Sequence, residues 1–449
     1  MAAQRGRGGW RSTTVGLDGS GGLRGDAGAP HVRLSPRASR GAVKRRDFLQ
    51  RSAATAGALV WPRHLDGLAQ ELHTSGGPWD VVRAAFLIPD DRIYLNVGTL
   101  GPQPRVVVDA VIEHTRRVAT TFPPATDWDA LKARVGAALN GDPEGFVFPR
   151  NTTEAMNFVA NGLELNAGDE VLTTLHEHIG GLCCWELLAA RRGVQLRQLD
   201  LPVPAASSEQ LVEVFRRAIT PRTRVISVSH VTFTNGTIMP VREIAAMCRQ
   251  RGIICVIDGA HPPGMMRVDL RAIDADFYAS SPHKWLCAPQ GTGLLYMRED
   301  WRTRLWPTLA SGGWNDTALG AHRFNHLGTM DESRLAGLDA ALRLHETIGT
   351  DAIEARVREL DALLLAGLAE LPRVRVVSPT DPTLGVGLIS FTMDGIEPLE
   401  LQRRLGEKNV RTRVVSEYGY GWMRLSPHIY TAESEIHAVV EMIAGAPAR

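Results

Sequence analysis

From about Asn96 to Met297, short runs of apolar and β-branched residues alternate with segments whose apolar residues recur at helical spacing. Runs of about four to eight such residues favour strands, whereas the longer segments with helical spacing favour amphipathic helices. This alternation is typical of a mostly parallel sheet covered by helices. The pattern predicts strands at 145–149, 169–174, 194–200, 224–231, 253–258 and 275–281, and helices at 152–163, 181–193, 208–219 and 241–252.

After Met330 the pattern changes. A long helical stretch at 333–349 continues to 363–371 and leads into shorter strands at 387–393 and 421–426, which we interpret as a second, smaller domain. The length of 449 residues, which exceeds one ordinary hydrophobic core, supports two domains. We therefore predict an α/β fold made of a disordered leader at 1–70, an N-terminal segment at 71–95, a large domain at 96–330 and a small C-terminal α+β domain at 331–449.

The charge of the chain is unevenly distributed. Through Arg51 there are eleven Lys and Arg against three Asp and Glu, which leaves 39 against 46 downstream and a net charge of −7 for the body of the protein. A mildly acidic body argues against a nucleic-acid surface. The basic part includes KRRDFLQRSAATAGALVWP at 44–62, where paired arginines precede Phe-Leu and an Ala-rich apolar segment, and this resembles a twin-arginine export signal.

Two interpretations of this leader stay open. It directs export to the periplasm or beyond, or it is a basic tail on a cytoplasmic protein. Residues 1–42 have a Gly-, Arg- and Ser-rich composition that predicts no fold, and Val43 is a candidate for the true start. The apolar segment near 52–61 is too short to span a bilayer. Since no later segment is long and apolar enough either, we expect no stable membrane insertion.

The cysteines give no sign of a disulfide framework or a metal site. Their number is odd and their spacing does not match metal-ligand motifs. An exported protein that folds in the cytosol would keep its thiols reduced. We expect small core residues at all five positions, which are Cys183, Cys184, Cys248, Cys255 and Cys287.

Several polar residues fall where predicted strands end, and in open parallel sheets ligands bind at those ends. Thr152 and Thr153, in NTTEA, stand between a strand and a helix, where free backbone N–H groups and hydroxyls suit an anion, although an ordinary N-cap explains them as well. His178 lies in a loop after the next strand. Asp258 ends a very apolar strand, where a carboxylate needs a cationic partner unless it caps a turn.

The segment YASSPHKWLCAPQGTG, at 278–293, places Lys284 directly after His283 and just before a glycine-rich run. A lysine that bonds covalently to a phosphorylated cofactor needs small residues, hydroxyl and imidazole donors and a dry pocket. Together with the strand-end residues, the segment indicates pyridoxal phosphate chemistry. Lys284 would bond to the aldehyde, and Asp258 would keep the pyridinium nitrogen protonated so that the ring acts as an electron sink.

Over most of residues 92–431 the sequence resembles the class V aminotransferase family of fold-type-I pyridoxal phosphate enzymes, which includes cysteine desulfurases, isopenicillin N epimerase and kynureninase-like lyases. The matching motifs are NTTEA, the Glu-His segment followed by Trp185, DGAH and SPHKW. The resemblance implies a phosphate site, a ring-stacking histidine, a residue near the phenolic oxygen and a Schiff-base lysine. By this resemblance, Thr152, Thr153, Ser281 and His283 would form the phosphate site and His178 would stack on the ring. His261 would lie near the phenolic oxygen, and Lys284 would form the Schiff base.

Three further segments match this family. HLGTMD, at 326–331, is similar to a segment that reaches the phosphate of the neighbouring subunit, which implies Gly328, Thr329 and a homodimer with shared active sites. MRLSPHIY resembles the stretch whose arginine pairs with the substrate α-carboxylate, here Arg424, which can do so bidentately. YLNVGTLGPQP, at 94–104, resembles an entry segment of epimerase-like members, and no role is assigned to it.

Departures from the family pattern narrow the subfamily. Desulfurases carry a mobile nucleophilic cysteine in the C-terminal third, and this chain has no cysteine after Cys287, so persulfide chemistry of that type is not expected. Phe233 stands where many relatives place an asparagine beside the cofactor, so we expect His261 to take over the contact with the phenolic oxygen. DGAH, SPHKW and RLSPHIY together most resemble the isopenicillin N epimerase-like branch.

The sequence therefore predicts a pyridoxal phosphate-dependent enzyme that acts at Cα of an amino acid. Arg424 would fix the carboxylate, and Lys284 would take the Cα proton as general base. Epimerisation, transamination and elimination by a C–S or C–C lyase stay open, because all three share these motifs. A non-catalytic protein that binds the cofactor is a further alternative, against which the presence of both Lys284 and Arg424 speaks.

Overall fold

The computed structural model describes residues 67, 70–72, 77–121 and 126–447. The chain divides into two compact units, Met1–Ala58 and Leu59–Arg449, and every described residue belongs to the second. The predicted leader, apart from residues 67 and 70, lies outside the described residues together with its arginine motif and stays a prediction. Within the described ranges, no helix is long and apolar enough to cross a membrane.

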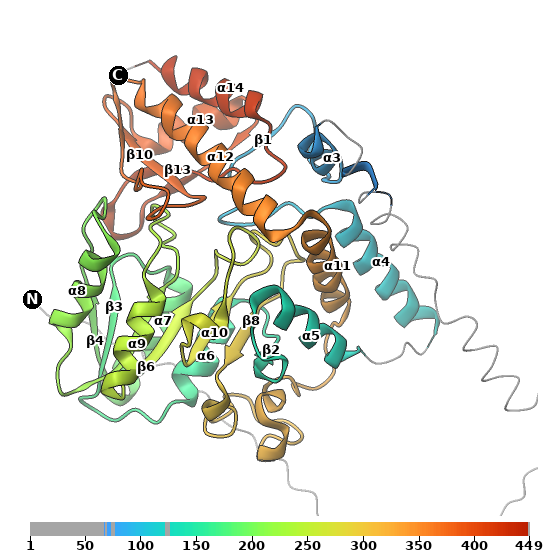
Figure 1. Cartoon of the computed structure of the whole chain (residues 1–449), viewed down its shortest axis with the longest axis vertical. Coiled ribbons are helices and arrows are strands. Elements are labelled where there is room, and N and C mark those ends of the chain that lie inside the picture. Colours follow the sequence, from blue (N-terminus) through green and yellow to red (C-terminus); the bar gives the residue numbers. More distant parts are fainter. Residues whose placement is uncertain (1–66, 68–69, 73–76, 122–125, 448–449) are drawn as a thin grey trace, which may run out of the picture. The chain divides into compact units, whose positions relative to one another are not determined.

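A seven-stranded sheet forms the centre of the larger part of this unit (Figure 1). Five neighbouring strands run parallel, and the next two pair antiparallel, so the prediction of a mostly parallel sheet is confirmed. The strands, in spatial order, are β2 (Phe146–Val147), β8 (Leu294–Met297), β7 (Phe277–Ser280), β6 (Ile254–Asp258), β5 (Thr223–Ser229), β3 (Glu170–Thr174) and β4 (Gln195–Leu199).

Two strands depart from the sequence pattern. The strand predicted at 145–149 is only the two-residue β2, because the 3-10 helix η1 (Pro143–Gly145) directly precedes it and Phe148 N donates to Asn325 Oδ1 at 2.9 Å instead of to a strand. β8 was not predicted. Its four residues follow a glycine-rich run and are too few to show a clear period.

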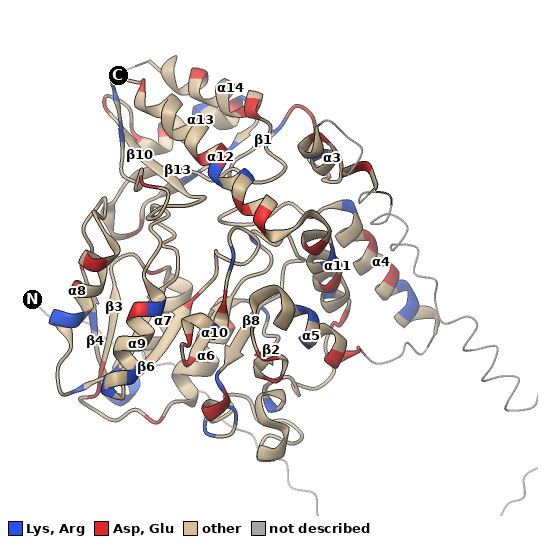
Figure 2. Ribbon diagram, in the orientation of Figure 1, with Lys and Arg blue, Asp and Glu red and all other residues tan. Residues whose placement is uncertain are grey.

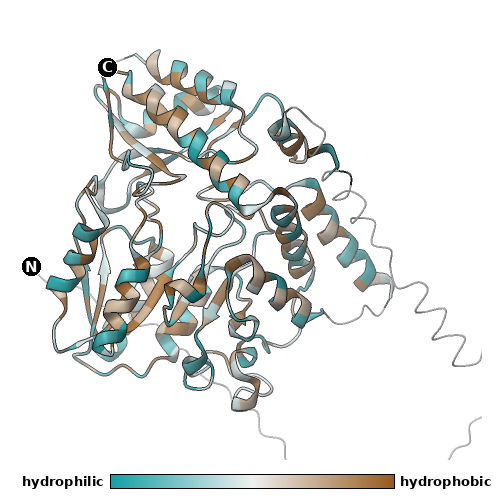
Figure 3. Ribbon diagram, in the orientation of Figure 1, coloured by the Kyte–Doolittle hydropathy of each residue, from teal (hydrophilic) through white to brown (hydrophobic). Residues whose placement is uncertain are grey.

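Helices cover both faces of this sheet, and successive strand residues enter two separate core clusters. On β6, Val256 belongs to one cluster and Ile257 to the other. The inner strands β5, β6 and β7 are correspondingly apolar (Figure 3), whereas the edge strand β4 is largely exposed. Burying each such side chain stabilises the fold by about 1.5–3 kcal/mol. The helices are α4 (Arg105–Thr120), α5 (Trp128–Leu139), α6 (Thr152–Gly162), α7 (Ile179–Arg192), α8 (Ser208–Ala218), α9 (Val241–Arg251), α10 (Leu270–Ile273) and α11 (Ser333–Ile348), with the 3-10 helices η2 (Glu299–Trp301) and η3 (Thr317–Phe324).

The C-terminal part contains a four-stranded antiparallel sheet with its own core, which includes Leu364, Phe391 and Met423. Acidic and basic residues are mixed in the first part of its longest helix (Figure 2), and some of them pair, as Arg358 does with Glu354 at 2.8 Å. The elements are β12 (Arg413–Val415), η4 (Glu417–Gly419), β13 (Trp422–Leu425), β10 (Ile389–Met393), β9 (Val374–Val376), α12 (Thr350–Ala369), α13 (Pro398–Glu407) and α14 (Glu433–Ala444).

The N-terminal segment connects this small sheet region to the lysine turn. After α3 (Pro78–Ala84), β1 (Ile93–Tyr94) pairs in parallel with β11 (Val410–Arg411). A few residues later, Gly101 N donates to His283 O at 2.8 Å. A Cβ at Gly101 would overlap the carbonyl oxygen of Lys284, so this approach requires glycine.

The cysteines only partly match the expectation of small core residues. Four of them are buried, whereas Cys183 is exposed on α7, and all five are free thiols. Cys183 and Cys184 are adjacent on a helix, so they point in different directions and only Cys184 reaches the core.

Candidate active site

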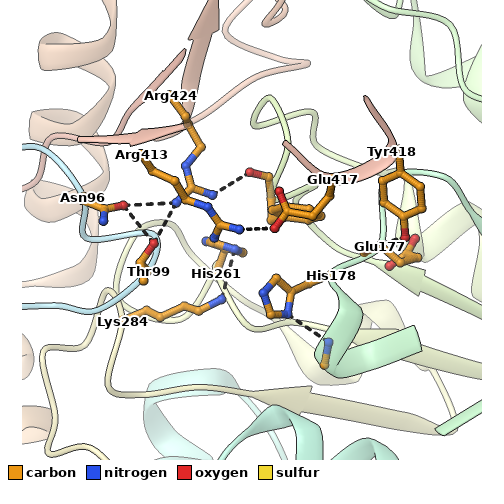
Figure 4. A network of polar contacts seen from close by, with 12 residues as sticks. Asn96, Thr99, Glu177, His178, His261, Lys284, Arg413, Glu417, Tyr418 and Arg424 are labelled. Carbon is orange, nitrogen blue, oxygen red and sulfur yellow. Dashed lines mark hydrogen bonds and ion pairs between the residues drawn. The ribbon is translucent and has the colours of Figure 1, made fainter. Parts of the chain in front are cut away.

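A cavity of about 220 Å³ lies where the parallel strands of the large sheet end (Figure 4). The start of α6, the start of α7, the end of β6 and the turn after β7 all contribute to its wall. The structure brings together here the sequence-predicted residues Thr152, Thr153, His178, Asp258, His261, Ser281, His283 and Lys284.

One end of the cavity suits an anion. Asn151 caps α6, since its Oδ1 accepts from Glu154 N at 2.9 Å, so the N-cap interpretation holds for Asn151 while the two threonines after it line the cavity. Thr152 N donates to Ser281 Oγ at 3.2 Å, and the hydroxyls of these two residues are 2.8 Å apart. A helix N-terminus with hydroxyl groups around it is a ready site for phosphate.

His283 stands beside this anion end. Its Nδ1 donates to Thr292 O at 3.3 Å, because a carbonyl oxygen can only accept. Burial, and after it the Lys284 ammonium, lowers the pKa of His283 to about 4. The imidazole is therefore neutral at pH 7, and a bound dianion would favour its protonation.

One carboxylate oxygen of Asp258 accepts no hydrogen bond from the described residues. The side chain is 6% exposed, and its Oδ1 accepts from Ala260 N at 2.9 Å, so it does cap the turn as the alternative interpretation proposed. Within the described part of the chain, Oδ2 accepts no hydrogen bond, and Gly181 approaches it so closely that a Cβ there would lie 2.6 Å away. Burial raises the pKa of Asp258, against the Lys284 charge and the Ala260 N–H. Such a carboxylate needs a cationic partner.

A hydrogen-bond chain runs from Trp285 through His261 to Lys284. Trp285 Nε1 donates to His261 Nδ1 at 3.0 Å, and Lys284 Nζ lies 3.2 Å from His261 Nε2. An indole N–H is only a donor, so Nδ1 must be unprotonated and the proton of the neutral ring sits on Nε2. Nε2–H then donates to the Lys284 amine, which fits only a neutral amine.

The environment of Lys284 supports that neutral state. Burial lowers the pKa of Lys284 to about 7; Asp258 acts against this change, and Arg424 and Arg413 reinforce it. An amine poised near neutral pH can act as nucleophile and as general base.

His178 and Phe233 form the wall next to the amine. His178 caps α7 by accepting from Gly180 N at 3.1 Å through Nδ1, and burial lowers its pKa to about 3. Its ring meets the edge of Phe233 at a centroid distance of 5.2 Å and an angle of 90°. Trp185, which the sequence places with His178, is fully buried and donates to Ser227 Oγ at 3.0 Å. This hydrogen bond connects α7 with β5.

Arg424, on β13, is fully buried and is not among the residues that line the cavity, but its partners Phe233 and Thr99 are. Its Nη1 donates to Phe233 O at 2.7 Å, and its Nη2 donates to Asn96 Oδ1 at 3.3 Å and to Thr99 Oγ1 at 3.2 Å (Figure 4). Its Nε has no partner within the described residues. All of these acceptors are neutral, so the guanidinium lacks a counter-charge in direct contact.

Sequence reasoning missed three residues of the site. Asn96 and Thr99 lie in the motif that resembled an entry segment, and their contact with Arg424 spans up to 328 residues of sequence. Arg413 lines the cavity and pairs with Glu417, which was not expected either. The sequence marks Arg413 only as a charged residue at the start of a short strand, which does not indicate a role in the site.

Gly328 and Thr329 lie apart from the cavity in this chain. Both are exposed, and Gly328 lines a separate surface hollow together with Trp128, His326 and Met330. The chain therefore does not bring them to its own Lys284. Their contact with a neighbouring subunit stays a prediction.

These residues fit pyridoxal phosphate: an anion cradle at α6, a neutral amine, and a buried carboxylate with a free oxygen for a cation. The fold and site define a pyridoxal phosphate-dependent enzyme of the fold-type-I class. The family model for Aminotransferase class-V matches residues 119–439, and the chain belongs to that family.

Similar proteins include epimerases and sulfur-processing enzymes. Isopenicillin N epimerase of Streptomyces clavuligerus is 31% identical over 388 residues, covering 81% of this chain and 97% of that protein. A probable cysteine desulfurase of Mycobacterium leprae is 29% identical over 346 residues, covering 72% and 81%. The solved structure of a C-DES mutant with glycine covalently linked to its pyridoxal phosphate cofactor superposes with a TM-score of 0.74 at 26% identity, covering 81% and 99%.

The first prediction concerns the pKa of Lys284, one of four lysines with Lys44, Lys132 and Lys408. In the cofactor-free protein, the rate at which an amine-directed reagent labels Lys284 should rise through about pH 7 and then level off. In Asp258→Asn the midpoint should fall below that of the wild type, because the carboxylate that favours the ammonium is gone. Peptide mass spectrometry measures the labelling.

Lys132 is the internal control. Burial acts to lower its pKa, but hydrogen bonds and charge from Glu144 and Asp129 outweigh this and raise it, so Lys132 should stay unreactive near pH 7. A Lys284 that labels only at the pH of an ordinary lysine would show that the amine is charged.

The second prediction concerns the tautomer of His261. Trp285→Phe keeps an aromatic ring but removes the indole donor, so the proton of His261 should shift from Nε2 toward Nδ1. Nitrogen chemical shifts of the labelled histidine measure this in the cofactor-free protein. Trp185→Phe is a matched control, because that indole is also buried but donates to Ser227 Oγ. An unchanged His261 in Trp285→Phe would contradict the proposed chain of hydrogen bonds.

Proposed function

We propose that this enzyme uses pyridoxal phosphate to epimerise an amino acid at Cα. The observation that carries the proposal is the Lys284 amine, with a pKa near 7, lying 3.2 Å from His261 Nε2 in a cavity that also holds a buried carboxylate. The similarity to an isopenicillin N epimerase, at 31% identity, supports the reaction type.

Each residue has a stated part in this proposal. When bound, pyridoxal phosphate supplies an aldehyde that takes up amines and a ring that withdraws electron density from Cα. Thr152, Thr153 and Ser281 would hold its phosphate. The Asp258 carboxylate would supply the negative charge for the ring nitrogen, and the His261 Nε2–H would be the donor for the phenolic oxygen.

The substrate is held and deprotonated by two further residues. Arg424 receives the α-carboxylate, which provides the counter-charge that its neutral acceptors lack. Lys284 Nζ takes the Cα proton, and in an epimerase a proton is then returned to the opposite face of Cα. His178, neutral and next to the cavity, shields the site from water.

The sulfur chemistry of the desulfurase relatives has less support. The sequence holds no cysteine after Cys287, and Cys287 itself is fully buried with a pKa raised by burial. A buried thiol of this kind is a poor nucleophile. Elimination and transamination remain alternatives that the product analysis below distinguishes.

The third prediction tests this function. The loaded enzyme is incubated with a panel of L-amino acids in heavy water, and loss of the Cα proton is followed by NMR together with the D to L ratio, keto acids and released sulfide. We expect exchange with inversion for at least one amino acid. Lys284→Ala should slow exchange by at least about a hundredfold, because the general base is lost.

Lys408→Ala is the control for this experiment, since Lys408 is exposed at the end of α13, outside the cavity. A keto acid or sulfide without a D-amino acid would replace epimerisation by transamination or elimination. The absence of exchange with every amino acid would contradict catalysis at Cα.

We also propose that the active enzyme is a homodimer in which Thr329 completes the phosphate site of the other subunit. Support comes from the exposed apolar residues near this segment, since Trp306, Leu309 and Trp314 are 53%, 49% and 40% exposed. Large exposed apolar side chains that cluster along one segment favour a protein interface.

The fourth prediction is that two inactive variants complement each other. In a mixed dimer of Lys284→Ala with Thr329→Asp, one site combines the intact Lys284 of one chain with the intact Thr329 of the other, so activity should return. Lys284→Ala with Arg424→Ala should give no recovery, because these residues act in the same chain. Failure of the first pair in dimers shown to exchange subunits would rule out a shared site.

A further inference from the structure

Two arginines face each other across the small sheet. Arg413 on β12 and Arg424 on β13 are direct partners in antiparallel pairing, so their side chains project from the same face. Like charges directly opposite each other destabilise a sheet. After burial, Arg413 is the main cause that lowers the pKa of Arg424, which shows that the two charges oppose each other.

Arg413 is directed into the cavity rather than into solvent. It lines the same cavity as Lys284, and its Cζ lies 5.3 Å from the centre of the Phe233 ring. The guanidinium thus rests over an aromatic ring, which fixes its position. Figure 4 shows both arginines entering from the small sheet, on the same side of Lys284.

The carboxylate that now accompanies Arg413 fits it incompletely. Glu417 forms an ion pair with Arg413 through Oε1, but its Oε2 is buried without any hydrogen-bond partner in the described structure. Glu417 begins the short turn η4, which ends at Gly419 and is soon followed by Gly421; these two glycines have positive φ angles of 75° and 61°. A carboxylate held in this way can be exchanged for another one.

We propose that Arg413 binds a carboxylate on the side chain of the substrate, while Arg424 binds the α-carboxylate, so the substrate is an acidic amino acid. The inference rests on the proposed function and names its substrate class. A neutral amino acid has one carboxylate for two guanidinium groups and leaves Glu417 on Arg413. An acidic amino acid supplies both anions, and Glu417 turns to solvent.

The fifth prediction compares isosteric twins, L-glutamate with L-glutamine and L-aspartate with L-asparagine. Binding is measured from the change in cofactor absorbance, and Cα exchange is measured in heavy water. For at least one pair, the loaded wild-type enzyme should bind the acidic twin roughly ten- to a hundredfold more tightly, as for a charge-assisted hydrogen bond.

Two variants separate the role of Arg413 from a structural one. Arg413→Gln should remove the preference by weakening the acidic twin much more than the amide twin, whereas Arg413→Lys should retain part of it. Glu417→Gln removes the competing carboxylate and should strengthen binding of the acidic twin. Thermal melting shows whether each variant is folded.

Two results would overturn the inference. If folded Arg413→Gln bound both the acidic and the amide twin equally more weakly, Arg413 would bind the α-carboxylate or only shape the site. If the preference for the acidic twin were unchanged, Arg413 would not bind the side-chain carboxylate. Because binding is measured separately, tight binding of the acidic twin without Cα exchange would contradict the proposed function and leave the assignment of Arg413 standing.

Discussion

The amine of Lys284 has to reach its neutral form near pH 7 while several charges lie close to it, and the site is arranged around this requirement. Burial and the two arginines lower its pKa, and Asp258 limits the change so that the value stays near 7. His261 then donates to the amine because Trp285 occupies its other nitrogen. The neutral form of Lys284 and the tautomer of His261 therefore depend on each other. Removing the Trp285 donor would change the His261 tautomer, and removing the Asp258 charge would change the pKa of Lys284.

The N-terminal segment makes the substrate side of this arrangement rigid. Asn96 and Thr99 hold Arg424, and Gly101 contacts the backbone of His283 at 2.8 Å and of Lys284. The same segment pairs with β11 in the small sheet region. A single stretch of chain thus links the guanidinium to the lysine turn, which accounts for the glycine at position 101 and for the motif around it.

Much of this site could be predicted from the sequence because its residues follow strand ends. Asp258 ends an apolar strand, and His178 and Lys284 lie in the turns that follow the strands ending at Thr174 and Ser280. A parallel sheet gathers such positions at one edge. Arg413 and Asn96 could not be found in this way. Their positions depend on the antiparallel pairing of β12 with β13 and on a contact over 328 residues, neither of which leaves a periodic signal.

Burial, with the charges of the cavity adding to it, explains why its histidines are neutral. It is the main cause that lowers the pKa of His178 and His261; Arg413 and Arg424 add to it, and Lys284 does so in its charged form. The phosphate of the cofactor and the carboxylates of a substrate would each add negative charge beside these rings, which favours their protonation. Of the three histidines, His283 alone can gain a proton without losing a hydrogen bond, because its Nδ1 already donates to Thr292 O. His178 and His261 each accept a hydrogen bond at Nδ1, from Gly180 N and from Trp285 Nε1, and this favours the neutral form of both rings.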